Sequence, residues 1–412
     1  MVLKPVFSEE LDFLKIKYNN KLWVDARCYY AFDKDMNRVM FGRNKNKIPN
    51  DLSPFLSHEE FLIKYFESST VKKVELEKKK LNKFLLSSDY DEIAISVSGG
   101  KDSTVVADMC YDICKSHKKT RVIFANTTNE THFTYRYVKK IYGSNLEIIN
   151  PKAGFYQWCK DNNFIPTRFS RACCKIFKEG IITPYLDNNK RILHVCGVRR
   201  SESKNRSSYE QLRKGNWDSK KAKENWDMYL PIVDFDDLDV WAYIFYNNID
   251  FNTLYRFGYN RVGCTNCPYR SDYELTLNDH FLPTYAKHWN SILTDVFIRN
   301  CVSIKTNCTL KEFLNGAWKS GVFRDKPTKE VIEEFAHYRG ISYKEAERYF
   351  KSNKCKCGKS LTKDVIALNM KILGRDTEAR MCLKCLSEFT GATQSKLKED
   401  IKKFKEDGCK LF

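Results

Sequence analysis

A run of six residues has the types and spacing of a phosphate-binding loop: Ser98, Gly99, Gly100, Lys101, Asp102 and Ser103. The two glycines let the backbone turn sharply and bring its N–H groups close to an anion. Lys101 can reach the terminal phosphates of a nucleotide, and the hydroxyl groups of Ser98 and Ser103 can donate hydrogen bonds. Asp102 can cap a following helix or help to hold Mg²⁺. The pattern therefore predicts a nucleotide site; a strand-to-helix turn that uses these residues for geometry alone is the alternative.

Four cysteines form a second group whose spacing suits a metal centre: Cys173, Cys174, Cys264 and Cys267. Four thiolates can hold a [4Fe–4S] cluster. Gly263 and Pro268, which flank the later pair, fit a tight cluster loop. Zinc is the alternative occupant of such a set, and buried thiols without a metal are the third interpretation.

Four more cysteines near the end of the chain form a separate group: Cys355, Cys357, Cys382 and Cys385. Two short-spaced pairs suit a tetrahedral Zn²⁺ site, and Gly358 suits the turn between ligands. We expect a structural, zinc-ribbon-like module, because so small a segment rarely has enough hydrophobic core to fold without its metal. Its lysine-rich surroundings would suit docking on nucleic acid or on a protein partner.

The phosphate-binding loop needs a strand before it and a helix after it, and the hydrophobic pattern supplies both. Residues 92–97 are typical of a buried strand that runs directly into the loop, and a helix continues from the loop to about residue 115. The pattern then repeats, with strands expected at 121–126, 146–149 and 191–196 and helices at 130–141 and 153–162. Strands that alternate with helices predict an α/β fold: a Rossmann-like α/β/α sandwich around a parallel sheet.

Polar residues follow two of these expected strands. They are Asn126, Thr127 and Glu130 after one strand, and Gly197, Arg199, Arg200, Glu202 and Arg206 after another. Open α/β sheets bind ligands beyond the carboxyl ends of their strands, and guanidinium groups suit phosphate and sulfate oxygens. These segments are therefore expected to line the nucleotide site, whereas any one of the arginines alone would be interpreted as a solvated loop charge.

Together these segments resemble the PP-loop ATP pyrophosphatases of the adenine nucleotide alpha-hydrolase type. The loop lacks the Walker A spacing and is similar to the Ser-Gly-Gly loop of that superfamily. Within it, the segment from Asn126 to Glu130 resembles the Asn-Thr-Gly motif of the phosphoadenosine-phosphosulfate (PAPS) reductase family, with Thr128 in place of the glycine. The adjacent cysteines followed by Lys178 resemble its Cys-Cys-x-x-x-Lys segment.

Two later segments complete the resemblance, which covers about residues 90–270. The stretch that begins at Gly197 resembles the family's Gly-x-Arg-x-x-Glu-Ser segment. Pro231-Ile232, followed by Asp239-Val240-Trp241, resembles its Pro-Ile and Asp-Val-Trp stretch. The resemblance implies an adenine-nucleotide site on the loop and strand-end residues, and a [4Fe–4S] cluster on the first cysteine group.

The 412 residues allow several domains. We expect a small β-rich N-terminal element at 1–57, a PP-loop domain at 58–275, a helical extension at 276–350 and the zinc-ribbon-like module at 351–412. The PP-loop domain is expected to begin with a helix over 58–86. The polar segment 199–228, which has few apolar residues, is expected to be a loop.

The composition limits where the protein works and what it binds. The formal net charge of +19 favours a polyanionic partner such as nucleic acid, although dispersed lysines on a solvated surface would give the same charge. No stretch has the length of apolar residues needed to span a bilayer, and the N-terminus has no apolar signal core, so we expect a cytoplasmic protein without a membrane partner. Sixteen cysteines in that compartment are expected to be metal ligands or buried thiols and not disulfides.

Two reactions fit these features, and Lys101, Asp102, Arg199 and Arg200 are the predicted catalytic residues for either. The first is ATP-dependent sulfur transfer to a nucleic acid such as tRNA or DNA, with a sulfur-donor protein as partner. The second is reduction of adenylyl sulfate or PAPS to sulfite. Adenylyl sulfate has no β- or γ-phosphate, so the intact lysine and aspartate of the loop favour ATP and Mg²⁺ as cofactors. A non-catalytic nucleotide-sensing module is the third class.

Cys409 bears on the choice between the two reactions. Reductases of the family carry a nucleophilic cysteine on a C-terminal tail, within Glu-Cys-Gly-Leu-His. The tail here reads Gly-Cys-Lys-Leu-Phe and departs from that motif. We therefore expect Cys409 to belong to the zinc module and the chain to act in sulfur transfer.

Overall fold

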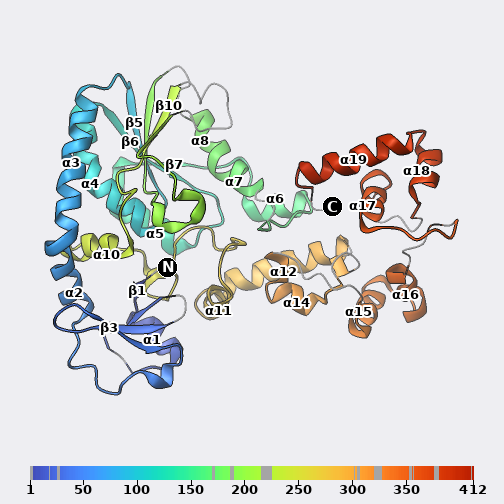
Figure 1. The fold of residues 1–412 in the computed structure, drawn as a ribbon, viewed down its shortest axis with the longest axis horizontal. Coiled ribbons are helices and arrows are strands. Elements are labelled where there is room, and N and C mark those ends of the chain that lie inside the picture. The colour runs from blue at the N-terminus through green and yellow to red at the C-terminus, as the bar shows by residue number, and fades with distance from the viewer. Residues whose placement is uncertain are drawn as a thin grey trace. The chain divides into compact units, whose positions relative to one another are not determined.

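A computed structural model describes residues 3–412 except 18, 26–27, 169–171, 186–189, 215–224, 301, 304–306, 320–326, 352–354, 356, 375–379 and 410. The chain divides into two compact units (Figure 1). Unit 1 consists of Met1–Gly154, Cys174–Thr265 and Thr276–Leu282. Unit 2 consists of Phe155–Cys173, Asn266–Leu275 and Pro283–Phe412.

A six-stranded sheet forms the centre of unit 1, with the strand order β7-β6-β5-β8-β10-β9. Its strands are β5 (Glu92–Val97), β6 (Lys119–Ala125), β7 (Leu146–Ile149), β8 (Ile192–Cys196), β9 (Leu212–Lys214) and β10 (Trp226–Tyr229). All neighbouring pairs are parallel except β9 with β10. The register places Ile95 of β5 between Val122 of β6 and Val195 of β8. The predicted α/β fold around a parallel sheet is confirmed.

The alternation of side chains along β5 explains why helices cover both faces of the sheet. Ile93 and Ile95 pack with buried residues of the helices on one face, whereas Ala94 packs with Ile182 on the other. The helices of unit 1 include α2 (His58–Tyr65), α3 (Val71–Leu86), α4 (Lys101–His117), α5 (His132–Tyr142), α8 (Gly180–Tyr185) and α10 (Asp237–Tyr246). A π-helical turn, Phe66–Thr70, joins α2 to α3, so the helix predicted over 58–86 is confirmed with one irregular turn.

A four-stranded antiparallel sheet precedes this domain, in the order β1-β2-β3-β4. Its strands are β1 (Lys4–Pro5), β2 (Trp23–Val24), β3 (Tyr29–Phe32) and β4 (Arg38–Gly42), and the helix α1 (Ser8–Leu14) follows β1. Phe32 of β3 stacks on Phe61 of α2, with ring centroids 3.8 Å apart. The β-rich character expected for the N-terminal element is therefore present, and aromatic contacts join it to the first long helix.

The segment predicted as a loop over 199–228 contains two strands of the sheet, so that prediction is wrong in its described part. Two 3₁₀ turns, Arg200–Glu202 and Lys204–Arg206, come first, and β9 and β10 follow. The strand β9 is short and polar because it lies at the edge of the sheet, where one side of a strand has no neighbour to bury it, whereas β10 lies inside the sheet and buries Trp226 and Tyr229. Residues 215–224 of the predicted loop lie outside the described residues.

Helices dominate unit 2, as predicted for the extension. They are α6 (Phe155–Asp161), α12 (Pro283–Arg299), α14 (Leu310–Leu314), α15 (Lys329–Arg339), α16 (Tyr343–Lys351), α17 (Lys363–Ile372), α18 (Leu383–Thr390) and α19 (Gln394–Glu406). The helices α7 (Ala172–Cys174) and α11 (Asp272–Phe281) each continue from one unit into the other along the chain. No described helix is long and apolar enough to cross a membrane.

In its described residues the C-terminal module is helical and differs from the expected ribbon. Its described residues form α17, α18 and α19, with no β-strand among them. Leu368, Leu386 and Leu397, one from each helix, meet in a small buried cluster. Each helix thus turns an apolar face to the other two, whereas the strands of a ribbon would need alternating apolar residues.

Candidate functional site

The predicted nucleotide site lies where the strand order of the sheet reverses. The chain moves from β5 outward through β6 to β7, and then returns to place β8 on the other side of β5. The loops that follow β5 and β8 therefore leave the same edge of the sheet side by side. A Cβ atom on Gly197 would lie 2.8 Å from the carbonyl oxygen of Asp102, so only glycine lets the end of β8 approach the start of α4 this closely.

The phosphate-binding loop has the geometry that its sequence predicts. Gly99 has a φ of +73°, a conformation that favours glycine, and α4 begins at Lys101. The hydroxyl group of Ser103 accepts a hydrogen bond from the backbone N–H of Ser98 (3.1 Å) and donates one to the carbonyl of Gly100 (3.0 Å). These bonds close the loop on the first turn of α4, whose N-terminus favours an anion.

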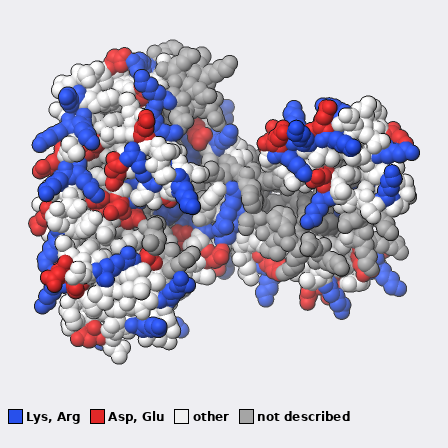
Figure 2. Space-filling view, in the orientation of Figure 1, with Lys and Arg blue, Asp and Glu red and all other residues white. Residues whose placement is uncertain are grey.

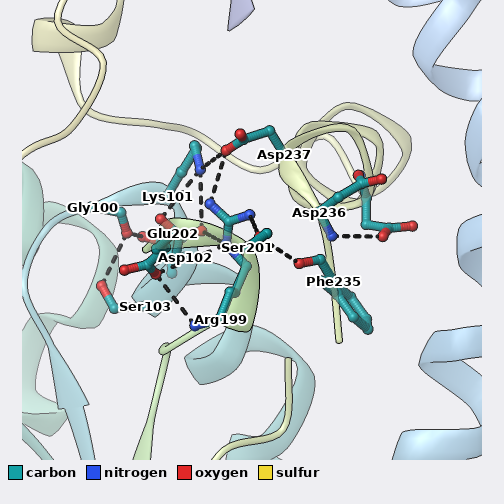
Figure 3. A network of polar contacts seen from close by, with 12 residues as sticks. Gly100, Lys101, Asp102, Ser103, Arg199, Ser201, Glu202, Phe235, Asp236 and Asp237 are labelled. Atoms are coloured by element: carbon teal, nitrogen blue, oxygen red, sulfur yellow. Dashed lines mark hydrogen bonds and ion pairs between the residues drawn. The ribbon is translucent and has the colours of Figure 1, made fainter. Parts of the chain in front are cut away.

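Two cations and two carboxylates meet beside this loop in what we call the charge quartet: Lys101, Asp102, Arg199 and Asp237 (Figure 3). Lys101 Nζ lies 3.1 Å from Oδ1 of Asp102 and 3.1 Å from Oδ1 of Asp237. Arg199 donates from Nε to Asp102 Oδ1 (2.6 Å) and from Nη2 to Asp237 Oδ1 (2.8 Å). Each cation therefore contacts both carboxylates.

The two cations of the quartet are buried, and the charges of the quartet hold one another in the ionised state. The side chains of Lys101 and Arg199 are only 3% and 4% exposed. Burial opposes the ionisation of Asp102, but the charges of Lys101 and Arg199 outweigh it and lower the pKa of this carboxyl group. Burial likewise disfavours the Arg199 cation, yet Asp102 and Asp237 raise its pKa. Cations suit phosphate oxygens, and carboxylates are the oxygen ligands that Mg²⁺ takes in proteins, so the residues present fit a magnesium nucleotide.

The other residues predicted after β8 lie around the quartet. Arg199 Nη1 donates to the hydroxyl of Ser201 (2.9 Å), and its backbone N–H contacts Glu202 Oε1 (3.3 Å). Glu202 also pairs with Arg206. Arg200 has different partners: it pairs with Asp234, and its Nε donates to a backbone carbonyl (2.7 Å). Among the predicted catalytic residues, three are thus members of the quartet, and Arg200 is held outside it.

The polar segment after β6 forms its own compact turn. The backbone N–H of Thr127 donates to Glu130 Oε2 (3.0 Å) and its hydroxyl to Oε1 (2.7 Å), while Asn126 donates to the side chain of Asn150 (2.8 Å). Burial raises the pKa of Glu130. Cys264 Sγ lies 3.5 Å from the Thr127 hydroxyl and 3.9 Å from Glu130 Oε1. One cysteine of the first group is therefore adjacent to a predicted nucleotide-binding segment.

The first cysteine group is divided between the two units. Cys174 and Cys264 belong to unit 1, whereas Cys173 and Cys267 belong to unit 2. Each unit is described by itself, so a joint [4Fe–4S] or zinc site on these four residues stays a prediction.

The second cysteine group is assembled within unit 2 by residues from two segments: Cys355, Cys357, Cys382 and Cys385. Their four sulfur atoms all lie within 4.8 Å of one another, and no other such group was found among the described residues. Burial opposes ionisation of Cys355, but hydrogen bonds from the backbone N–H groups of Cys357 and Cys382 lower its pKa to about 6. The backbone N–H of Cys385 lowers the pKa of Cys382 in the same way. Four thiols, stabilised as thiolates in part, are a donor set that fits Zn²⁺.

Three residues that contact the loop were not predicted from the sequence. Asp237 completes the quartet, Tyr255 Oη accepts from the backbone N–H of Lys101 (2.9 Å), and Asn252 Nδ2 donates to the carbonyl of Gly99 (3.2 Å). An aspartate at the start of a helix is an ordinary capping pattern, and a tyrosine or asparagine in a turn is equally common. Nothing in their local sequence separates them from structural residues.

The fold and the quartet together define a class of protein: an α/β domain with a glycine-containing loop and a buried cluster of charges at the switch point of a parallel sheet. The particular family follows from comparison with known proteins. The family model of the phosphoadenosine phosphosulfate reductase domain matches residues 92–270, so this part of the chain is similar to that family. The resemblance predicted from the motifs is confirmed.

Individual relatives share parts of the chain. An uncharacterized protein of Methanocaldococcus jannaschii is 31% identical over 204 residues, which cover 49% of this chain and 47% of the relative. The adenosine 5′-phosphosulfate reductase of Lysinibacillus sphaericus is 28% identical over 191 residues, or 43% of this chain and 73% of the relative. The chain thus spans less than half the length of the first of these curated relatives.

Solved structures with a similar fold include the U34-tRNA thiolase of Methanococcus maripaludis with its [4Fe-4S] cluster. The likeness has a TM-score of 0.34 and 13% sequence identity, and it covers 64% of this chain and 88% of the thiolase.

Proposed function

We propose that this chain is an ATP-using sulfurtransferase that thiolates a nucleic acid. The observation that carries the proposal is the charge quartet beside an intact phosphate-binding loop. Lys101 and Arg199 supply two positive charges for the phosphates of ATP, and Asp102 supplies a carboxylate oxygen for Mg²⁺. An adenylyl sulfate has no β- or γ-phosphate to occupy the lysine, so the quartet is better matched to ATP.

The proposed reaction has two steps. An oxygen atom of a nucleobase attacks the α-phosphorus of ATP, and pyrophosphate leaves with the pair of electrons from the broken P–O bond. A sulfide equivalent, supplied by a donor protein, then attacks the activated carbon atom, and AMP leaves with the original oxygen. A [4Fe–4S] cluster on Cys173, Cys174, Cys264 and Cys267 would present that sulfur when bound.

The C-terminal tail supports transfer over reduction. The backbone N–H of Cys409 donates to the carbonyl of Phe404 in α19 (2.8 Å), and that of Phe412 donates to the carbonyl of Cys409 (3.1 Å). The ring of Phe412 stacks on that of Phe404, with centroids 5.5 Å apart. A reductase needs a thiol on a tail that can enter the site and leave it again, and here the tail folds back on its own helix.

The test compares products from two nucleotides. Anaerobically purified protein, first analysed for iron and sulfide, is incubated with Mg²⁺ and either ATP or adenylyl sulfate, in the presence of tRNA and a sulfide source. We expect AMP and pyrophosphate from ATP, sulfur incorporated into the RNA, and little sulfite from adenylyl sulfate or PAPS with thioredoxin.

The reductase is the second candidate, because curated relatives that match residues of this domain carry that name. Rapid sulfite release that disappears in Cys409→Ser would contradict sulfur transfer and favour a reductase with a divergent tail. Sulfite release that persists in Cys409→Ser would also contradict our proposal, and would point to another thiol.

A further inference from the structure

The residue of the charge quartet that no sequence motif marks is Asp237, and it reaches the site from a different element than the other three. It is the first residue of α10, 136 positions after Lys101. Its Oδ1 atom accepts from Lys101 Nζ (3.1 Å) and from Arg199 Nη2 (2.8 Å), and its side chain is 10% exposed. A single carboxylate oxygen therefore joins two cations that come from the ends of two different strands.

The start of α10 is fixed by contacts that do not involve the site. Asp236 caps the helix by accepting from the backbone N–H of Asp239 (2.9 Å), and Asp239 accepts in return from the backbone of Asp236 (2.9 Å). Asp239 is fully buried and also binds the hydroxyl of Thr70 (2.9 Å) and Nζ of Lys73 (2.6 Å). The π-helical turn and α3 thus hold α10 in place. The position of Asp237 in the quartet is therefore set by contacts outside the site.

The position of this carboxylate creates a competition with any phosphate that binds. A phosphate oxygen that pairs with Lys101 or Arg199 replaces a contact made by Asp237 and comes close to its negative charge. A nucleotide that carries Mg²⁺ avoids this cost, because the metal lies between phosphate and carboxylate oxygens and attracts both. The quartet therefore penalises a bare polyphosphate more than the same polyphosphate with its metal.

We infer that Asp237 is a positioning and specificity-determining residue that holds Lys101 and Arg199 for the phosphates and makes nucleotide binding depend on Mg²⁺. The inference rests on the proposed function only in taking ATP as the nucleotide. In the bound state Lys101 and Arg199 pair with phosphate oxygens, and the carboxylates of Asp102 and Asp237 turn toward the metal.

The test measures the affinity for ATP by calorimetry in excess Mg²⁺ and in EDTA, for the full chain and its variants. The deciding quantity is the Mg²⁺ factor, which is the dissociation constant of ATP in EDTA divided by that in excess Mg²⁺. In Asp237→Asn this factor should fall at least tenfold, because free ATP is no longer repelled and the metal loses a charged partner. Asp237→Glu should restore part of it. Asp236→Ala, which weakens the cap of the same helix, controls for loosening of α10 and should change both affinities by a similar factor.

The outcomes separate this inference from the proposed function. A wild-type chain that binds no ATP under either condition would contradict both. ATP binding by the wild type, with the same Mg²⁺ factor in Asp237→Asn, would overturn the role of Asp237 alone. A fall of the factor in Asp236→Ala as large as in Asp237→Asn would also overturn it, because the effect would then come from the helix and not from the carboxylate.

Discussion

Lys101 and Arg199 show how single residues keep charge in a buried site. An isolated buried cation would lose its proton or unfold the site, because removing it from water costs several kcal/mol, on the order of the stability of a domain. Each of the two has two carboxylate contacts instead, and the four charges cancel. The four side chains are therefore already ordered without a nucleotide, and a phosphate that binds exchanges ion pairs instead of ordering free side chains.

The first prediction concerns Lys101, whose Nζ faces the carboxylates of the quartet. Lys101→Ala should weaken ATP binding at least tenfold, about 1.4 kcal/mol, since the contact to the terminal phosphates is lost. AMP, which has no such phosphates, should be affected much less. Lys115→Ala, an exposed lysine on the same helix, serves as the matched control. Equal losses for ATP and AMP in calorimetry would refute the phosphate role of Lys101.

At the scale of elements, the ends of β5 and β8 matter most, because they carry the loop and Arg199 to the same edge. β8 contains a buried histidine, His194, whose Nε2 lies 2.5 Å from the hydroxyl of Ser96 on β5 and 3.4 Å from Cys196 Sγ. Burial lowers the pKa of His194 to about 4. The two central strands are thus joined by a neutral imidazole that cannot be charged without disturbing the sheet.

The second prediction follows from this pKa. An unfolded histidine binds a proton near pH 6.5, whereas the folded one does so only near pH 4, so the unfolded state gains protons first as the pH falls. As the pH falls from 6.5 to 4, the titration of His194 should therefore lower the free energy of unfolding by roughly 3 kcal/mol. Urea unfolding at several pH values should show that the free energy of unfolding of the wild type, minus that of His194→Gln, falls by roughly this amount as the pH falls from 6.5 to 4. A constant difference would contradict the buried, neutral histidine.

At the scale of the whole molecule, the net charge of +19 comes from basic residues that are dispersed along the sequence. Figure 2 shows Lys and Arg side chains over the visible face, with Asp and Glu between them. Charge of this kind attracts a polyanion at long range. The specific features of the chain are instead local: the quartet in unit 1 and the four-cysteine group in unit 2.

The third prediction is that the C-terminal module needs its metal. The described helices α17 to α19 share only a small leucine cluster, and a second small cluster includes Cys355 and Cys382. Such cores rarely suffice alone, so removal of Zn²⁺ should unfold the module. We expect one zinc per chain at the four cysteines, and proteolytic cleavage within residues 355–412 after chelation and in Cys382→Ser. Cys409→Ser, which lies outside the group, is the control and should retain the metal.

Metal-free protein that resists proteolysis as well as the zinc-loaded form would contradict this role. Iron in place of zinc at these residues would confirm a metal site but refute zinc as the metal.

The sequence alone determined the local structure around the chemistry. Local apolar pattern and backbone sterics determine three elements: the buried strand 92–97, the glycine turn and the helix after it. All three were predicted. The cysteine pairs near the C-terminus were equally readable, because ligand spacing along the chain limits which atoms can reach one ion. The same local patterns failed for β9, where polar residues at a sheet edge do not alternate in a recognisable way.

Only the tertiary structure decided what joins the loop. Asp237 lies 136 residues from Lys101, and its sequence context is that of any capped helix. Its place in the quartet depends on the strand order, on the buried contacts of Asp239, and on the absence of a side chain at Gly197. Contacts between distant segments are set by how whole elements pack, and this packing is a collective property that no short stretch of sequence encodes.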